Sequence, residues 1–157
     1  QYFEIEKPKA RYWYDFKINK LPVNVKVSQC TGTDNVSSFK GLFYAMTGLD
    51  PEKQAIDTWA KKLAVLRENM RDTEADYYFL VINKKEITKS YWTSIKRIRS
   101  VAPNGNNLPF QVNWGQVNED WGIRNFDDVV ETVIKNGLGE SLKKRAQAWM
   151  DFQENFN

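Results

Sequence analysis

The sequence predicts one α/β domain in which helices flank a mixed central sheet, and three observations lead to this expectation. Apolar and polar residues alternate from Arg11 to Ser28, which predicts two paired strands. A continuous apolar run over 77–83 (YYFLVIN) predicts a strand buried on both faces. Helical spacing of apolar residues separates these stretches, as is typical of a sheet with helices packed on its faces. We expect all 157 residues to form a single domain.

The composition excludes several kinds of active site. The chain has no histidine and one cysteine, Cys30, which rules out histidine-based nucleophiles, imidazole zinc sites and an intramolecular disulfide. Any hydrolytic chemistry must therefore use carboxylates, lysines and a metal ion held by oxygen ligands. The net charge of +3 permits a polyanionic partner. No apolar run approaches the roughly 20 residues of a membrane span, so we expect no membrane association and a cytoplasmic, reducing location.

The first strand pair is predicted to be a hairpin that turns at Asn19-Lys20, because Asn tolerates a positive φ. In this register Phe16 faces Val23, and the neighbouring pairs on that face are also apolar, so that face is expected to pack on the core. The opposite face carries the polar residues Asp15, Asn24 and Lys26, which would form one cluster. The alternative is an ordinary amphipathic hairpin with a solvated charged face.

This cluster resembles the PD-(D/E)XK motif of a nuclease superfamily that includes many type II restriction endonucleases. Tyr14-Asp15 matches the first half of the motif, and Asn24-Val25-Lys26 matches the second. The sequence departs from the family in two places. Asn24 stands where the family usually has Asp or Glu, and Tyr14 stands where it often has Pro. More loosely, most of the chain is similar to restriction endonucleases in the order of hairpin, long helix, buried strand and basic segment.

The resemblance implies a restriction-endonuclease-like fold that cleaves phosphodiester bonds of double-stranded DNA, of the site-specific restriction type, as a homodimer. In that interpretation Asp15 anchors Mg²⁺, Asn24 contributes a weaker oxygen ligand, and Lys26 lies beside the attacking water. Asp34 in the following loop either adds an oxygen near the metal or caps the next helix. The chain begins with Gln1, which is compatible with a longer protein that supplies an N-terminal portion.

Two helices are predicted between the hairpin and the buried strand. The first runs from about Ser37 to Thr47, with Gly48 as its C-cap. The second opens at Asp50-Pro51, an N-cap followed by proline at the first helical position, and ends near 70–72. Its apolar stripe indicates packing on one side, and nothing in it indicates catalysis.

A DNA-facing surface is predicted over residues 84–116, where basic and aromatic residues precede an amide-rich stretch. Lysine and arginine neutralise phosphates, and Asn and Gln can contact base edges. The alternative is a solvated charged strand with an ordinary Asn-Gly turn. The candidate DNA-binding residues are Lys84, Lys85, Lys89, Tyr91, Lys96, Arg97, Arg99, Asn104, Asn106, Asn107, Gln111 and Asn113.

Two helices are predicted at the C-terminal end of the sequence. The first spans 123–136, is capped by Asn125 and ends at Asn136-Gly137. The second spans 140–156 and is expected to pack inward. Its inward residues would be Leu142, Ala146, Trp149, Met150 and Phe152.

Two other functions remain open at this point. The chain could be a non-catalytic DNA-binding module on a nuclease scaffold with a degenerate metal site. Asn24 favours this alternative because an amide binds a divalent ion less strongly than a carboxylate. It could also be a protein-binding α/β domain without nucleic acid.

Overall fold

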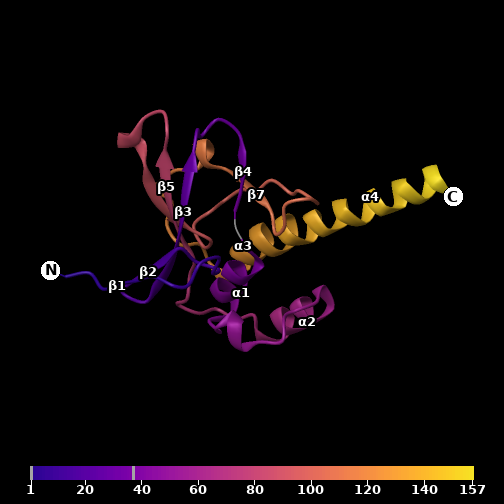
Figure 1. The fold of residues 1–157 in the computed structure, drawn as a ribbon, viewed down its shortest axis with the longest axis horizontal. Helices are drawn as coiled ribbons and strands as arrows, with labels where there is room; N and C mark the ends of the chain where they lie inside the picture. The colour runs from indigo at the N-terminus through magenta and orange to yellow at the C-terminus, as the bar shows by residue number, and fades with distance from the viewer. Residues whose placement is uncertain (1, 37) are drawn as a thin grey trace.

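A computed structural model describes residues 2–36 and 38–157 and has the predicted class, an α/β single domain with a mixed sheet (Figure 1). The five-stranded sheet has the order β1-β2-β3-β5-β6, in which only β3 and β5 are parallel. The strands are β1 (Ile5–Glu6), β2 (Phe16–Ile18), β3 (Leu21–Ser28), β5 (Tyr78–Asn83) and β6 (Tyr91–Ser94). A second, two-stranded sheet pairs β4 (Thr33–Asn35) with β7 (Gln111–Asn113).

The predicted hairpin turn and register are confirmed. Asn19 and Lys20 have φ of 48° and 69°, so both central residues of the turn have positive φ, as a twisted two-residue hairpin requires. Phe16 pairs with Val23 as expected. The first strand is shorter than predicted, because regular pairing stops before Asp15.

The predicted orientation of the hairpin is wrong. Asn24 and Lys26 pair with Phe79 and Val81 of β5, which are both fully buried against the helices. The valine face of β3 lies on the other side of the sheet, where Val27 is 59% exposed. For the same reason β5 is buried on one face and not on both. The described helices cover only one side of the sheet, so the polar cluster lies on the helix side.

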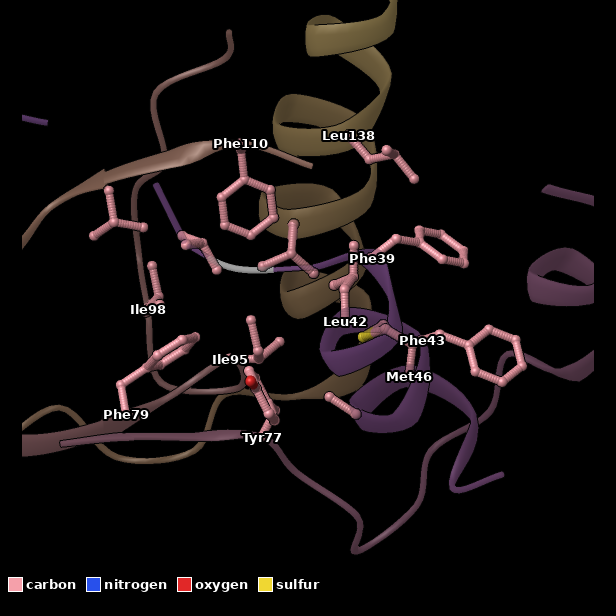
Figure 2. Close-up of a cluster of buried hydrophobic side chains, with 14 of the residues drawn as sticks. Phe39, Leu42, Phe43, Met46, Tyr77, Phe79, Ile95, Ile98, Phe110 and Leu138 are labelled. Atoms are coloured by element: carbon pink, nitrogen blue, oxygen red, sulfur yellow. The ribbon is translucent and has the colours of Figure 1, made fainter. Parts of the chain in front are cut away.

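The core forms between that side of the sheet and α1 (Phe39–Thr47). Figure 2 shows side chains of α1 such as Leu42 and Met46 gathered with Tyr77, Phe79 and residues of the C-terminal half of the chain. A Cβ at Gly41 would lie 2.6 Å from the ring of Tyr77, so α1 approaches the sheet closely because this position is glycine. The predicted helix start at Ser37 lies outside the described residues, and Gly48 is the left-handed C-cap that was predicted.

The second predicted helix is broken. Asp50 accepts a hydrogen bond from the N–H of Glu52 and caps a single 3₁₀ turn over Pro51–Lys53. The helix α2 begins only at Trp59, after a second cap at Thr58, and ends at Asn69. The N-cap and proline at Asp50-Pro51 therefore begin a short turn, and the long helix begins eight residues later at Trp59.

The two C-terminal helices are continuous, so the predicted end at Asn136-Gly137 is wrong. The helix α3 (Phe126–Val129) passes through a π-helical stretch (Val130–Gly139) into α4 (Glu140–Phe156). Asn125 caps α3 as predicted, by accepting from the N–H of Asp128. Gly137 packs against the ring of Phe110, so this glycine serves close packing within the helix.

The prediction that α4 packs inward is also wrong beyond its first turn. Leu142 is partly buried, whereas every residue from 143 to 156 is exposed, including the expected inward residues Ala146, Trp149, Met150 and Phe152. Figure 1 shows α4 extending away from the rest of the domain. Among the described residues, no helix is both long and apolar enough to cross a membrane.

Candidate functional site

Asp15 lies where the pairing of β2 with β3 ends. Its backbone N–H donates to the carbonyl of Val23 at 2.9 Å, and its carboxylate Oδ2 accepts from the N–H of Val25 at 2.6 Å. The side chain thus takes the place of the backbone acceptor that a longer strand would have supplied. A carboxylate can accept about four hydrogen bonds, so this contact orients Asp15 and leaves capacity for another ligand.

Lys26 lies in the middle of β3, on the helix side of the sheet, and its side chain is partly buried. Burial lowers the pKa of its ammonium group, and the negative charges of Asp15 and Asp34 act in the opposite direction. The two acids are therefore close enough to influence this lysine electrostatically. Among the described residues, no ion pair within 4 Å joins Lys26 to Asp15 or to Asp34, which lies in β4.

Asn24 precedes Lys26 by two residues and lies on the same face of β3. Its side-chain oxygen Oδ1 is buried and has no hydrogen-bond partner among the described residues. A buried amide oxygen without a partner costs free energy, of the order of 1–3 kcal/mol. Such an atom is a reason to expect a ligand at this position.

Asp34 is brought back to the end of β3 by the loop that connects β3 to β4. Its Oδ2 accepts a hydrogen bond of 2.5 Å from the hydroxyl of Ser28, and the same hydroxyl accepts from the N–H of Cys30 at 2.9 Å. Asp34 therefore does not cap α1, which was one of the two expectations for it. Ser28 was missed in the sequence, although its position two residues after Lys26 places it on the same face of the strand.

A polar groove of about 300 Å³ lies beside this cluster. Its lining residues include Ser28, Asp34 and Lys84. The N–H of Lys84 donates to the carbonyl of Ser28 at 2.9 Å, because β3 and β5 are parallel and end at the same edge of the sheet. The first lysine of the predicted DNA-facing segment therefore borders the same groove as Asp34.

Asp15, Asn24 and Asp34 offer oxygen atoms of the kind that a hard cation prefers, but only two of the three residues carry a negative charge. Two carboxylates and the orphaned amide oxygen of Asn24 are the oxygen ligands that Mg²⁺ prefers. In the described part of the chain, no three or more His, Cys, Asp or Glu residues are grouped so that they could hold a metal ion. A divalent ion bound here would therefore rely on a neutral ligand or on groups from outside this chain.

Several of the predicted DNA-binding residues are on the surface. Lys84, Lys85 and Lys89 are exposed in the loop between β5 and β6, where Lys89 also pairs with Glu86 at 2.7 Å. A larger cleft of about 570 Å³ opens beside this loop and is lined by Lys89 and by amides of residues 83, 116 and 118. Further along the segment Arg99 is exposed, with its guanidinium 5.4 Å from the ring centre of Trp121.

Other members of the predicted DNA-facing set lie in the interior, and for them the prediction is wrong. Lys96 is 5% exposed and donates to the carbonyl of Thr73. Tyr91 is buried and its hydroxyl donates to the carbonyl of Trp114. Arg97 is half-buried, 3.6 Å from the buried carboxylate of Asp76. These side chains bond to other segments of the chain at Thr73, Asp76 and Trp114 and take part in the interior of the domain.

The amide-rich stretch mainly stabilises local structure. Gln111 accepts from Asn104 and donates to Asn35, which links β7 to β4 and to the turn before it. Asn113 accepts from the N–H of Gly115 and begins the 3₁₀ turn Trp114–Gln116. Of the remaining two amides, Asn106 is exposed and Asn107 is partly buried.

No protein-family model, no curated protein and no solved structure matches the chain.

Proposed function

We propose that this protein is a Mg²⁺-dependent endonuclease that cleaves double-stranded DNA, with a fold of the restriction-endonuclease type. The observation that carries the proposal is the row of Asn24, Lys26 and Ser28 on the helix side of β3, where Ser28 donates a hydrogen bond to Asp34 and Asp15 accepts one from the N–H of Val25. The orphaned oxygen of Asn24 on the same face supports it. A site-specific restriction role and a cytoplasmic location belong to the same proposal.

In this proposal, each residue of the site has a separate role in binding or catalysis. Asp15, held by the N–H of Val25, presents its carboxylate at the end of the hairpin ladder. Lys26 places its ammonium beside the scissile phosphate and offsets the negative charge that grows in the transition state. Partial burial strengthens this interaction, because charges act more strongly where water is excluded. Lys84, Lys85 and Lys89 bind the phosphates of the duplex beside the groove.

Asp15, Asn24 and Asp34 would hold Mg²⁺, and the ion would polarise the phosphoryl oxygens and lower the pKa of a bound water. Asn24 would contact the ion with its amide oxygen, while the hydroxyl of Ser28 donates to Asp34 and fixes the position of its carboxylate.

The test is incubation of mixed-sequence DNA with the protein and Mg²⁺, followed by electrophoresis. The wild type is expected to give discrete fragments. Lys26→Ala and Asp15→Asn are each expected to lose cleavage by about 10²-fold or more while DNA binding is retained. The matched control is Lys20→Ala in the exposed hairpin turn, which should cleave normally. Full metal-dependent activity in both site variants would refute the proposal.

A second candidate function is DNA binding without cleavage, and the neutral Asn24 favours it. The variant Asn24→Asp separates the two. It should raise both Mg²⁺ affinity and cleavage if the site is active. If the chain only binds DNA, Asn24→Asp should change neither, and DNA retention should still weaken steeply with salt.

A further inference from the structure

A polar cleft of about 570 Å³ adjoins the groove of the candidate site. Residues from the end of β5 and the loop to β6 line one part of it, and residues that follow β7 line another. Its volume is in the range of sites that enclose a small organic ligand. The cleft and the groove share Cys30, and Asn83 lines the cleft while its neighbour Lys84 lines the groove. A ligand that extends past Cys30 can therefore occupy both.

Two amides of the cleft are held in place by the backbone. The Oδ1 of Asn83 accepts from the N–H groups of Lys85 and Glu86, each at 3.0 Å. The Oδ1 of Asn118 accepts from the N–H of Asp120 at 2.8 Å. Because each oxygen is bonded to the backbone, the group that each amide offers to a ligand is its NH₂ donor.

Other residues of the lining add both kinds of hydrogen-bonding group. Glu119 contributes a carboxylate acceptor, Gln116 contributes an exposed amide, and Lys89 contributes an ammonium group. A matching ligand has donors and acceptors along one edge, as nucleobases have, and Asn, Gln and Glu contact such edges in proteins. Phosphate and carboxylate groups have acceptors only, so they match less well beside Glu119. A nucleotide joins a base edge to a phosphate, and the adjoining groove presents Lys84 to that phosphate.

The segment that follows β7 is anchored before a ligand arrives. The hydroxyl of Tyr91 donates to the carbonyl of Trp114, and burial raises the pKa of Tyr91, so this hydroxyl remains a donor. Asn113 accepts from the N–H of Gly115 at 3.1 Å. A Cβ at Gly115 would lie 2.1 Å from the carbonyl oxygen of Cys30, so the two loops touch through their backbones. A preformed cleft binds without the entropy cost of ordering its loops.

We propose that the cleft binds one nucleobase of the substrate, turned out of the duplex, next to the phosphate that lies in the groove. This inference rests on the proposed nuclease function. A stacked base does not reach the inside of a concave site, so the base must leave the stack. Glu119 accepts from an exocyclic amino group, while Asn83 and Asn118 donate to acceptors on the base. Guanine, adenine and cytosine carry an amino group and thymine does not, so the cleft disfavours thymine.

The test is calorimetric titration of the whole chain with deoxynucleoside 5′-monophosphates in the absence of Mg²⁺. The guanine nucleotide should bind about tenfold more tightly than the thymine nucleotide and than deoxyribose 5-phosphate, which has no base. Alkylation of Cys30 by iodoacetamide, detected by mass spectrometry, is a second measurement, because the chain has one cysteine. The guanine nucleotide should slow this alkylation more than deoxyribose 5-phosphate does.

The variants Asn83→Asp and Asn118→Asp retain the oxygen that the backbone N–H groups bond, and they replace the NH₂ donor with an acceptor. Each should weaken binding of the guanine nucleotide about tenfold, with an unchanged circular dichroism spectrum. Glu119→Gln should reduce the preference for guanine over thymine. The matched control is Asn136→Asp, at an exposed amide of the π-helical stretch, which should bind as the wild type does.

Equal affinities for the guanine nucleotide and deoxyribose 5-phosphate would overturn the inference, as would full binding in both amide variants. A wild type that cleaves DNA but fails these tests overturns the base site and leaves the nuclease function standing. A wild type that binds the guanine nucleotide as expected but cleaves no DNA supports the base site and overturns the nuclease function.

Discussion

Lys26 shows how one residue can carry a cost that a function explains. Its ammonium is partly withdrawn from water on the helix side of the sheet, and burial lowers its pKa despite the nearby acids Asp15 and Asp34. A methionine would fill similar space without that cost. A charged group retained where an apolar one would be more stable is typical of a functional site.

Lys26→Met is expected to be more stable than the wild type at neutral pH. Between the lowered pKa and the ordinary value of 10.5, the unfolded chain binds more protons at this lysine than the folded chain, so the wild-type free energy of unfolding rises with pH over that window. The free energy of unfolding of Lys26→Met should therefore exceed that of the wild type by the full amount below the lowered pKa, and this difference should vanish above the ordinary pKa. Urea unfolding at several pH values measures this, and a stability difference independent of pH would contradict it.

At the scale of elements, the candidate site depends on loops that lock together. Gly115, in the 3₁₀ turn after β7, lies so close to the loop after β3 that a Cβ would be 2.1 Å from the carbonyl oxygen of Cys30. This backbone contact holds the loop that returns Asp34 to Ser28. The site therefore needs β7, which is distant in sequence from the hairpin.

Gly115→Ala is expected to destabilise the protein by roughly 1–3 kcal/mol, because backbone has to move to admit the methyl group. It should also reduce any Mg²⁺-dependent activity, since the loop that leads from Ser28 to Asp34 would shift. Gly122→Ala is the matched control, because a Cβ there meets nothing within 4 Å, and it should be nearly neutral. Thermal unfolding of the two variants measures the effect, and equal melting temperatures would contradict it.

At the scale of the whole molecule, the described helices cover one face of the sheet and leave the other largely open. The open face carries an apolar groove lined by Phe3, Ile18, Leu21, Val23, Tyr78 and Trp92. Its rim is well exposed, with Leu21 at 42% and Trp92 at 45%. The two faces therefore differ in how much stability they contribute, although both are rich in apolar residues.

Equivalent substitutions on the two faces should have unequal effects. Val81→Thr buries a hydroxyl among helix-side residues and should cost about 1–3 kcal/mol. Val27→Thr, at a position that is 59% exposed, should change stability by less than about 0.5 kcal/mol. Denaturant unfolding compares the two variants. If both variants lost the same free energy of unfolding, both faces of the sheet would have to be covered in solution.

Local patterns predicted those features whose causes are local. Asn19-Lys20 favoured the turn, and alternation in both strands defined the pairing of Phe16 with Val23. The burial of Lys96 could not be predicted, because its partners at Thr73 and Asp76 come from a segment twenty residues earlier. Nor could the exposure of α4, since its amphipathic pattern equally suits packing against its own domain or against another helix.

The sequence by itself determined the α/β class, the hairpin and its register, and the exclusion of histidine and thiolate chemistry, because these follow from side-chain types and their spacing. Only the tertiary structure decided which face of the sheet is core. The alternation in β3 favoured its valine face as core, whereas both faces of β5 carry apolar or aromatic side chains. The choice depended on where α1 packs, which is a contact between segments distant in sequence. That choice moved Asn24 and Lys26 from open solvent to the edge of the core, where a charge is partly desolvated.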